Sequence, residues 1–231
     1  MGSLKEFEAK IIMLGDTTVG KSTLIDCLIN GPRGVSENGL QTTRGKKIQK
    51  FLFILTFSAP DNVYHNFAIS ERIVKTNIWD TVGQEKYKSV NKQFYNKAHG
   101  ALLVADVSVY ANEDNLHFWI QEFRKVVGPE ACIILTGNKA DKEQNTATVE
   151  LLERFAQEYK IPFCLTSAAL GTNVQETMGL LVNMIAEKFL LNTVGNDDDD
   201  EDESEDLKRT VLSTNSHRLT KNKQSKCCVG C

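Results

Sequence analysis

The sequence predicts an α/β protein with a mostly parallel sheet and helices on both of its faces. Apolar runs alternate along the chain with segments of helical spacing, and this alternation is typical of strand–helix–strand crossovers. The runs at Ala101–Asp106 and Cys132–Gly137 are almost continuously apolar, as parallel strands buried on both faces are. Ligands of such sheets bind at the C-terminal ends of the strands. Polar motifs that follow strands are therefore the candidate functional residues.

Each expected strand is an apolar run, and each expected helix has apolar residues three and four positions apart. The expected strands are Phe7–Leu14, Ile48–Ser58, Arg72–Asp80, Ala101–Asp106, Cys132–Gly137 and Pro162–Leu165. The expected helices are Lys21–Asn30, Asn112–Val127, Val149–Tyr159 and Val174–Leu191. The first helix stops at the breaker Gly31-Pro32, and the glycine-rich stretch that follows it, to Gly45, is an expected loop.

Length and composition fit one domain at residues 1–192 and a tail at 193–231. Of the 231 residues, 41% are hydrophobic, which is ordinary for a globular core. The net charge of −3 conceals an acidic block at 197–206, which we expect to be disordered. The body has no basic excess, so we expect no nucleic-acid partner. No apolar run approaches the ~20 residues of a membrane-spanning helix, and we expect no secretory leader.

The segment Gly15–Ser22 follows the first expected strand and opens the first expected helix. Gly15 and Gly20 allow a tight loop whose backbone N–H groups hold phosphate oxygens. Lys21 supplies a cation for the β- and γ-phosphates, and Ser22 supplies a hydroxyl ligand for Mg²⁺. The candidate phosphate-binding residues are Gly15, Asp16, Thr17, Thr18, Val19, Gly20, Lys21, Ser22 and Thr23.

A second motif, Asp80-Thr-Val-Gly-Gln84, comes at the end of the strand that contains Trp79. Asp80 suits a carboxylate on the Mg²⁺ side of a triphosphate. Gly83 lets its N–H approach the γ-phosphate, and Gln84 would orient the attacking water. The motif therefore predicts the catalytic end of a nucleotide site.

Two further motifs predict that the base is guanine. Asp141, in Asn138-Lys-Ala-Asp141, can accept hydrogen bonds from N1–H and the N2 amino group of guanine, a donor pair that adenine lacks. The stem of Lys139 can lie along the base, and Asn138 can tie this loop to the phosphate loop. Later in the chain, the backbone N–H of Ala168 can meet the guanine O6. The residues of this last motif are Ser167, Ala168 and Ala169.

In this order the motifs resemble those of Ras superfamily small GTPases, and the segments around the second switch resemble the Rab branch. The Rab-like segments are Lys75–Trp79, Lys86–Val90, Phe94–Ala98 and Leu103–Ser108. The resemblance implies a P-loop GTPase domain with a six-stranded, mostly parallel sheet and about five helices. It also implies a monomer that cycles between GTP and GDP with Mg²⁺ and binds effectors through its switches. In Rab proteins an aromatic triad displays the active state, and Trp79 and Phe94 would be two of its members.

The first switch departs from the Rab pattern. Thr43 is the expected Mg²⁺ ligand, because Gly45 follows it as in the family, and Thr42 is the alternative. No Phe or Tyr stands between Ser22 and Thr43, although the family places an aromatic there against the guanine. An insertion centred on Ser58–Glu71 suggests a longer β-hairpin with its tip at 59–62.

The tail ends with three cysteines, Cys227, Cys228 and Cys231. The Cys227-Cys228 pair resembles the double prenylation site of Rab proteins, and two lipid chains anchor a protein where one does not. The resemblance implies a prenyl-binding chaperone and attachment to the cytoplasmic face of endomembranes, with cycling through the cytosol. A metal-binding cysteine cluster is the alternative.

The sequence as a whole predicts a GTP-hydrolysing switch that regulates vesicle traffic. No arginine clearly serves the transition state in cis, so a GTPase-activating protein is expected beside an exchange factor. Two alternatives stay open. The irregular first switch suits a nucleotide-bound scaffold with little turnover, although Gln84 argues against it. The acidic tail suits a Ran-like transport GTPase, although the terminal cysteines argue against that.

Overall fold

The computed structural model describes residues 7–32, 62–69, 72–81, 94–194 and 227–228. Within these residues the strands form one sheet in the order β2-β3-β1-β4-β5-β6-β7. The strands are β1 (Phe7–Leu14), β2 (Asn62–Ile69), β3 (Arg72–Asp80), β4 (Gly100–Asp106), β5 (Cys132–Asn138), β6 (Phe163–Leu165) and β7 (Cys227–Cys228). The described helices are α1 (Lys21–Asn30), α4 (Glu113–Val127), α5 (Thr146–Tyr159) and α6 (Val174–Val194).

The first six strands confirm the mostly parallel sheet. β1 lies in the middle and runs parallel to both β3 and β4, and β5 and β6 continue the parallel order. β2 pairs antiparallel with β3 at one edge. At the other edge β7 adds two residues antiparallel to β6. The topology is therefore that of a P-loop GTPase domain with a short added strand.

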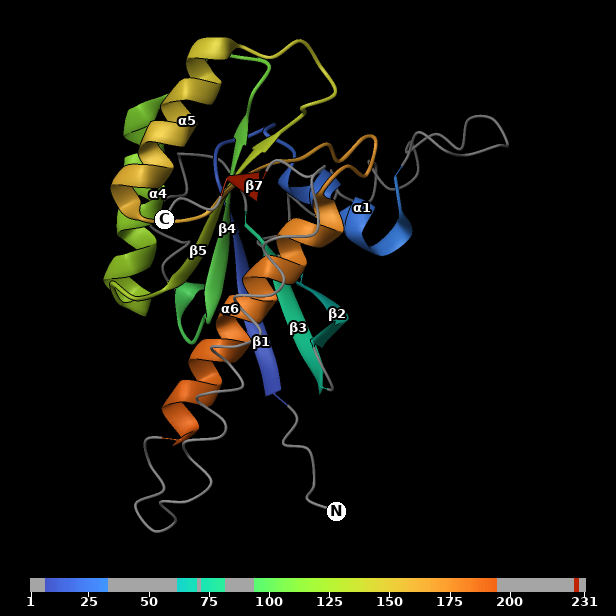
Figure 1. Ribbon diagram of the computed structural model, residues 1–231, viewed down its shortest axis with the longest axis vertical. Helices are drawn as coiled ribbons and strands as arrows, with labels where there is room; N and C mark the ends of the chain where they lie inside the picture. Colours follow the sequence, from blue (N-terminus) through green and yellow to red (C-terminus); the bar gives the residue numbers. More distant parts are fainter. Residues whose placement is uncertain (1–6, 33–61, 70–71, 82–93, 195–226, 229–231) are drawn as a thin grey trace, which may run out of the picture.

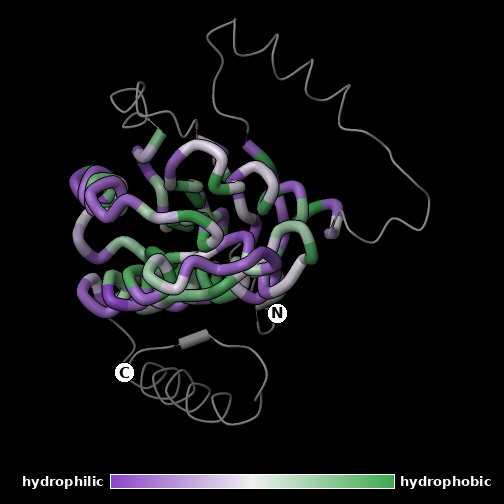
Figure 2. Tube along the Cα trace, turned by 90° about the horizontal axis from the view of Figure 1, so that it is seen from above, coloured by the Kyte–Doolittle hydropathy of each residue, from purple (hydrophilic) through white to green (hydrophobic). Residues whose placement is uncertain are grey.

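The sheet is the middle layer of three. Helices α1 and α6 cover one face and α4 and α5 cover the other (Figure 1). Side chains of β1 alternate between the two resulting cores, because successive residues of a strand point to opposite faces. Ile11 and Met13 pack with the α1 and α6 side, and Ile12 and Leu14 pack with the α4 and α5 side. In Figure 2 hydrophobic residues gather toward the interior of the trace and hydrophilic ones toward its outside, in keeping with the buried cores.

The parallel strands bring the predicted motifs to one edge of the sheet. Gly15 follows β1, Thr81 follows β3, Asn138 ends β5 and Thr166 follows β6. Because these strands run in the same direction, their C-terminal ends meet there. The fold thus places motifs that are far apart in the sequence next to one another.

The hairpin partner of β3 differs from the expectation. Asn62 pairs with Trp79 and Ile69 pairs with Arg72, so the turn falls between Ile69 and Arg72. The predicted tip at 59–62 is wrong, since Asn62 already begins the strand. The predicted strand Ile48–Ser58 lies outside the described residues.

The described helices lie where helical spacing predicts them, with shifts at their ends. α5 begins at Thr146, three residues before the expected start, because Asn145 caps it by accepting a hydrogen bond from the backbone N–H of Thr148 at 3.0 Å. α6 runs to Val194, past the expected domain boundary at 192. None of the described helices is long and apolar enough to cross a bilayer.

Candidate functional site

The phosphate loop has a backbone that only glycine can adopt at its two ends. Gly15 has a φ of 128°, and a methyl group there would lie 2.2 Å from the carbonyl oxygen of Val104 on β4. Gly20 has a φ of 105°, and a methyl group there would lie 2.3 Å from Nδ2 of Asn138. Both contacts are far inside van der Waals distance. The loop is therefore packed tightly between β4 and the guanine motif.

Helix α1 begins directly after this loop, and its N-cap residue, Gly20, provides no side-chain cap. The first backbone N–H groups of a helix have no partner within the helix, and the helix dipole places partial positive charge there. An anion such as phosphate is the natural partner of such an end. Thr17, Thr18 and Ser22 are exposed beside it, whereas Gly15 and Val19 are buried.

The Lys21 side chain is buried and turns back over the loop. Its Nζ donates to the carbonyl oxygens of Gly15 at 2.8 Å and of Asp16 at 2.6 Å. Only 6% of Lys21 is exposed, so its charge depends on these oxygens and on any ligand in the loop. The geometry holds a cation across the cradle where phosphate oxygens would lie.

Ser22 and Asp80 meet next to the lysine. The Ser22 hydroxyl donates to Oδ2 of Asp80, which joins the start of α1 to the end of β3. Thr81 fixes this end of β3, because its Oγ1 donates to the carbonyl of Met13 on β1 at 2.5 Å. A hydroxyl and a carboxylate are the hard oxygen ligands that Mg²⁺ prefers. These two residues therefore fit a magnesium ion bound beside a triphosphate.

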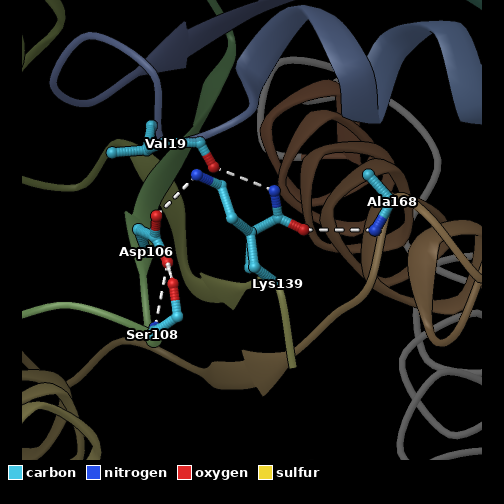
Figure 3. Close-up of polar contacts among 6 residues, drawn as sticks. Val19, Asp106, Ser108, Lys139 and Ala168 are labelled. Carbon is cyan, nitrogen blue, oxygen red and sulfur yellow. Dashed lines mark hydrogen bonds and ion pairs between the residues drawn. The ribbon is translucent and has the colours of Figure 1, made fainter. Parts of the chain in front are cut away.

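Asn138 connects three segments of the site (Figure 3). Its Nδ2 donates to the carbonyl of Val19 in the phosphate loop at 2.9 Å. Its Oδ1 accepts from the backbone N–H of Ala168 at 3.2 Å and from the hydroxyl of Thr166 at 3.4 Å. The side chain is 1% exposed, so it couples the phosphate loop to the guanine loops. The N–H of Ala168, expected to meet the guanine O6, is donated to Asn138 here.

Asp141 and Ser167, both predicted to belong to the base site, lie next to each other. The Ser167 hydroxyl donates to Oδ1 of Asp141 at 2.5 Å and accepts from the backbone N–H of Leu170 at 3.1 Å. Ser167 is buried, whereas Asp141 and Ala169 are exposed. Ser167 therefore orients the carboxylate while leaving it open to solvent, where a base could enter.

Lys139 is held by a residue that sequence reasoning did not assign to the site. Its Nζ lies 2.5 Å from Oδ2 of Asp106, at the end of β4 (Figure 3). Oδ1 of Asp106 accepts from the backbone N–H of Ser108 at 2.9 Å and from its hydroxyl at 2.6 Å. Burial disfavours the charged carboxylate, but the hydrogen bonds from Lys139 and Ser108 outweigh it and lower the pKa of Asp106. A polar residue at the end of an apolar strand is the signal that could have found Asp106.

Asp16 points away from the phosphate side. Its carboxylate accepts from the side chains of Asn115 and Trp119 on α4. Several other predicted site residues, namely Thr43 with its alternative Thr42, Gly83 and Gln84, lie outside the described residues. Cys227 and Cys228 are described as strand β7. No group of three or more His, Cys, Asp or Glu side chains suited to a metal occurs in the described part of the chain.

A loop of the phosphate-binding type with a buried lysine, together with the predicted base-recognition loops at the same sheet edge, is typical of a P-loop nucleotide-binding protein. The sequence model of the Ras family matches residues 51–187. The chain therefore belongs to the Ras family, whose members bind GTP and GDP with magnesium and hydrolyse GTP.

Similar proteins place the chain near the Rab branch. It is 30% identical over 177 residues to the Ras-related protein RabG2 of Dictyostelium discoideum, covering 76% of this chain and 81% of that protein. It is 30% identical over 190 residues to the Ras-related protein SEC4 of Saccharomyces cerevisiae, covering 81% and 80%. It is 31% identical over 178 residues to human Ras-related protein Rab-4B, covering 76% and 75%. The chain is thus a Rab-like small GTPase.

Proposed function

We propose that this protein is a Rab-type switch that binds GTP and GDP at the described sheet edge and regulates vesicle traffic through effectors. The main support for nucleotide binding is the position of Asn138. Its side-chain amide is hydrogen-bonded to Val19 in the phosphate loop and to Ala168 in the guanine loop. One side chain thereby couples phosphate binding to base recognition. The Rab-like segments and the Rab names among the relatives support the traffic role.

In the proposed site each side chain has a separate task. Lys21 and the first N–H groups of α1 hold the phosphates, and Ser22 and Asp80 hold Mg²⁺, with Thr43 completing that set. The ion, when bound, offsets the charge of the phosphates. Asp141 selects guanine, and Lys139, held by Asp106, lies along the base. Gln84 orients the attacking water.

The choice of base tests this proposal directly. We expect GDP and GTP to bind far more tightly than ADP or ATP, because Asp141 meets a donor pair that adenine lacks. Asp141→Asn should shift the preference toward xanthine nucleotides, since an amide N–H then faces the C2 carbonyl. Competition against a fluorescent GDP measures both effects. As a control, Asp114→Asn removes an exposed aspartate from α4 and should leave the preference for guanine over adenine and xanthine nucleotides unchanged. Equal affinity of the unaltered protein for ATP and GTP would contradict the proposal.

Hydrolysis is the second test, and it separates the switch from the nucleotide-bound scaffold that the irregular first switch favours. An orienting glutamine without an arginine in cis gives Ras an intrinsic rate on the order of 10⁻⁴ s⁻¹. We expect similarly slow turnover here and strong stimulation by an activating protein. Gln84→Leu should abolish the stimulation and leave GTP binding intact. Single-turnover assays with candidate activators measure this, and the absence of turnover in the unaltered protein under all of them would favour the scaffold.

A further inference from the structure

The phosphate loop contains an acidic side chain. Asp16 is its second residue, next to Gly15, in a loop that is proposed to hold a polyanion. Like charges a few ångströms apart repel by about 1 kcal/mol in water and by more where water is excluded. A carboxylate that turned toward the phosphates would therefore weaken their binding.

The structure turns this carboxylate the other way. Oδ1 of Asp16 accepts from Nε1 of Trp119 at 2.9 Å, and Oδ2 accepts from Nδ2 of Asn115 at 2.8 Å. Both donors stand on α4, four residues apart and hence on the same side of the helix. Each carboxylate oxygen has its own donor, so the side chain is fixed in a two-point contact.

The donors are themselves well anchored. Trp119 is 1% exposed and belongs to the core between the sheet and the α4 and α5 layer. Its ring packs edge-on against Phe118 with centroids 5.5 Å apart. α4 begins with a cap at Asn112, which accepts from the backbone N–H of Asp114 at 3.0 Å. The helix can therefore act as a fixed support for the loop.

The backbone of Asp16 continues the connection toward the ligand. Its carbonyl oxygen accepts from Nζ of Lys21 at 2.6 Å, and Lys21 is the cation proposed for the phosphates. The side chain of Asp16 is fixed by α4, and its backbone carbonyl accepts a hydrogen bond from Lys21. The position of Asp16 therefore determines the position of the Lys21 ammonium group. The contacts run from α4 through Asp16 to Lys21.

We propose that Asp16 is a positioning residue, which Asn115 and Trp119 hold so that its carbonyl seats Lys21 and its negative charge faces away from the phosphates. This inference rests on the proposed nucleotide site. It assigns two residues of α4, remote in sequence from every nucleotide motif, to control of nucleotide retention. Loss of either donor frees a carboxylate beside the phosphates. The loss should affect GTP more than GDP, since GTP carries the additional negative charge of its γ-phosphate.

A double-mutant cycle in the full-length, Mg²⁺-loaded protein tests the inference. Trp119→Phe keeps an aromatic ring and removes the N–H, while Asp16→Ala removes the carboxylate and keeps the carbonyl. We expect Trp119→Phe to speed release of fluorescent GDP about fivefold, which corresponds to about 1 kcal/mol, and to speed release of a non-hydrolysable GTP analogue more. In the Asp16→Ala background the same substitution should change both rates by less than twofold.

A spectroscopic measurement adds a readout that packing alone would not move. The chain has two tryptophans, so a ¹⁵N-labelled sample shows two indole N–H resonances, and Trp79→Phe identifies the one from Trp119. Asp16→Ala should shift the Trp119 resonance and speed its hydrogen exchange. If Trp119→Phe fails to fold, Asn115→Ala removes the other donor from a partly exposed position and is expected to give the same cycle.

The outcomes separate this inference from the proposed function. Equal acceleration by Trp119→Phe in both backgrounds would mean that Trp119 acts by packing, and the inference would be overturned while nucleotide binding stood. Unchanged rates in all variants would overturn it in the same way. If the unaltered protein bound no guanine nucleotide, both would fall together.

Discussion

At the scale of single residues, the guanine motif depends on a charge from the neighbouring strand. Lys139 has a φ of 68°, a left-handed conformation that is uncommon for a residue with a side chain. Its ammonium group is fixed by Asp106, which Ser108 holds in turn with two hydrogen bonds. A long side chain on a backbone of uncommon conformation is thus fixed at its far end.

Asp106→Asn should lower both stability and GDP affinity at neutral pH. The pKa of Asp106 is lowered in the folded protein, so its contribution is present above the ordinary aspartate pKa of about 3.9 and is lost as the pH falls through the lower folded value. Lys139 is partly exposed, so we expect a loss of about 1 kcal/mol in unfolding free energy. Urea unfolding of the GDP-bound protein at neutral and acidic pH measures it.

The matched control for that variant is Glu113→Gln. This substitution breaks the ion pair between Oε1 of Glu113 and Nη2 of Arg154, which lie 3.1 Å apart. The side chain of Glu113 is 37% exposed and that of Arg154 is 65% exposed. Solvent screening makes such a pair worth little, so unfolding should change by only a few tenths of a kcal/mol. An Asp106→Asn effect that persisted unchanged well below the aspartate pKa would contradict the charge-based account.

At the scale of elements, the end of α1 meets the guanine loop. The helix stops at Gly31, and the next residue, Pro32, lies against Gly171 in the loop after β6. A methyl group built on Gly171 would lie 3.1 Å from Cβ and from Cγ of Pro32. Pro32 is the last described residue before the segment in which the sequence predicts the first switch.

Gly171→Ala should therefore speed GDP release a few-fold. The φ of 76° at Gly171 strains any residue with a side chain by about 1 kcal/mol, and the added methyl group pushes against Pro32 beside the base site. Gly128→Ala is the matched control, because Gly128 has a φ of 106° and open space around it. It should lower stability to a similar degree and leave the release rate unchanged. Stopped-flow measurement with labelled GDP compares the two, and equal release rates would contradict the role of this contact.

The elements also show which part of the structure the sequence could predict. β4 and β5 are buried on both faces, and their continuous apolar runs made them recognisable. β2 was not predicted as a strand, because it mixes apolar and polar residues. Its antiparallel pairing with β3 depends on contacts between strands, which the pattern within one segment does not indicate. The motifs placed Lys21, Asn138 and Asp141 at the same edge. Sequence reasoning missed the supporting residues Asp106, Asn115 and Trp119. Asn115 and Trp119 donate hydrogen bonds to Asp16 across 99 and 103 positions of chain, a distance over which no local pattern indicates a contact.

At the scale of the whole molecule, the two cysteines proposed for lipidation take part in the sheet. Cys228 pairs with Phe163 and Cys227 pairs with Cys164, antiparallel to the edge strand β6. A two-residue strand on a three-residue edge forms few hydrogen bonds and cannot be stable by itself. A prenylating enzyme would therefore find this segment open part of the time.

Replacing Cys227 and Cys228 together with Ser should release the protein from membranes to the cytosol. One lipid chain gives only marginal, reversible binding and two give a stable anchor, so each single substitution should leave an intermediate fraction on membranes. Nucleotide affinity should stay unchanged, because β7 pairs with β6 through backbone groups, which a change from Cys to Ser keeps. Fractionation of cells that express the full chain measures how the protein divides between membranes and cytosol, and intact mass reports the attached lipid. Cys132→Ser changes a buried cysteine within the domain and serves as the control for loss of a thiol. Persistent membrane association of the double variant would place the anchor at Cys231 or on a protein receptor.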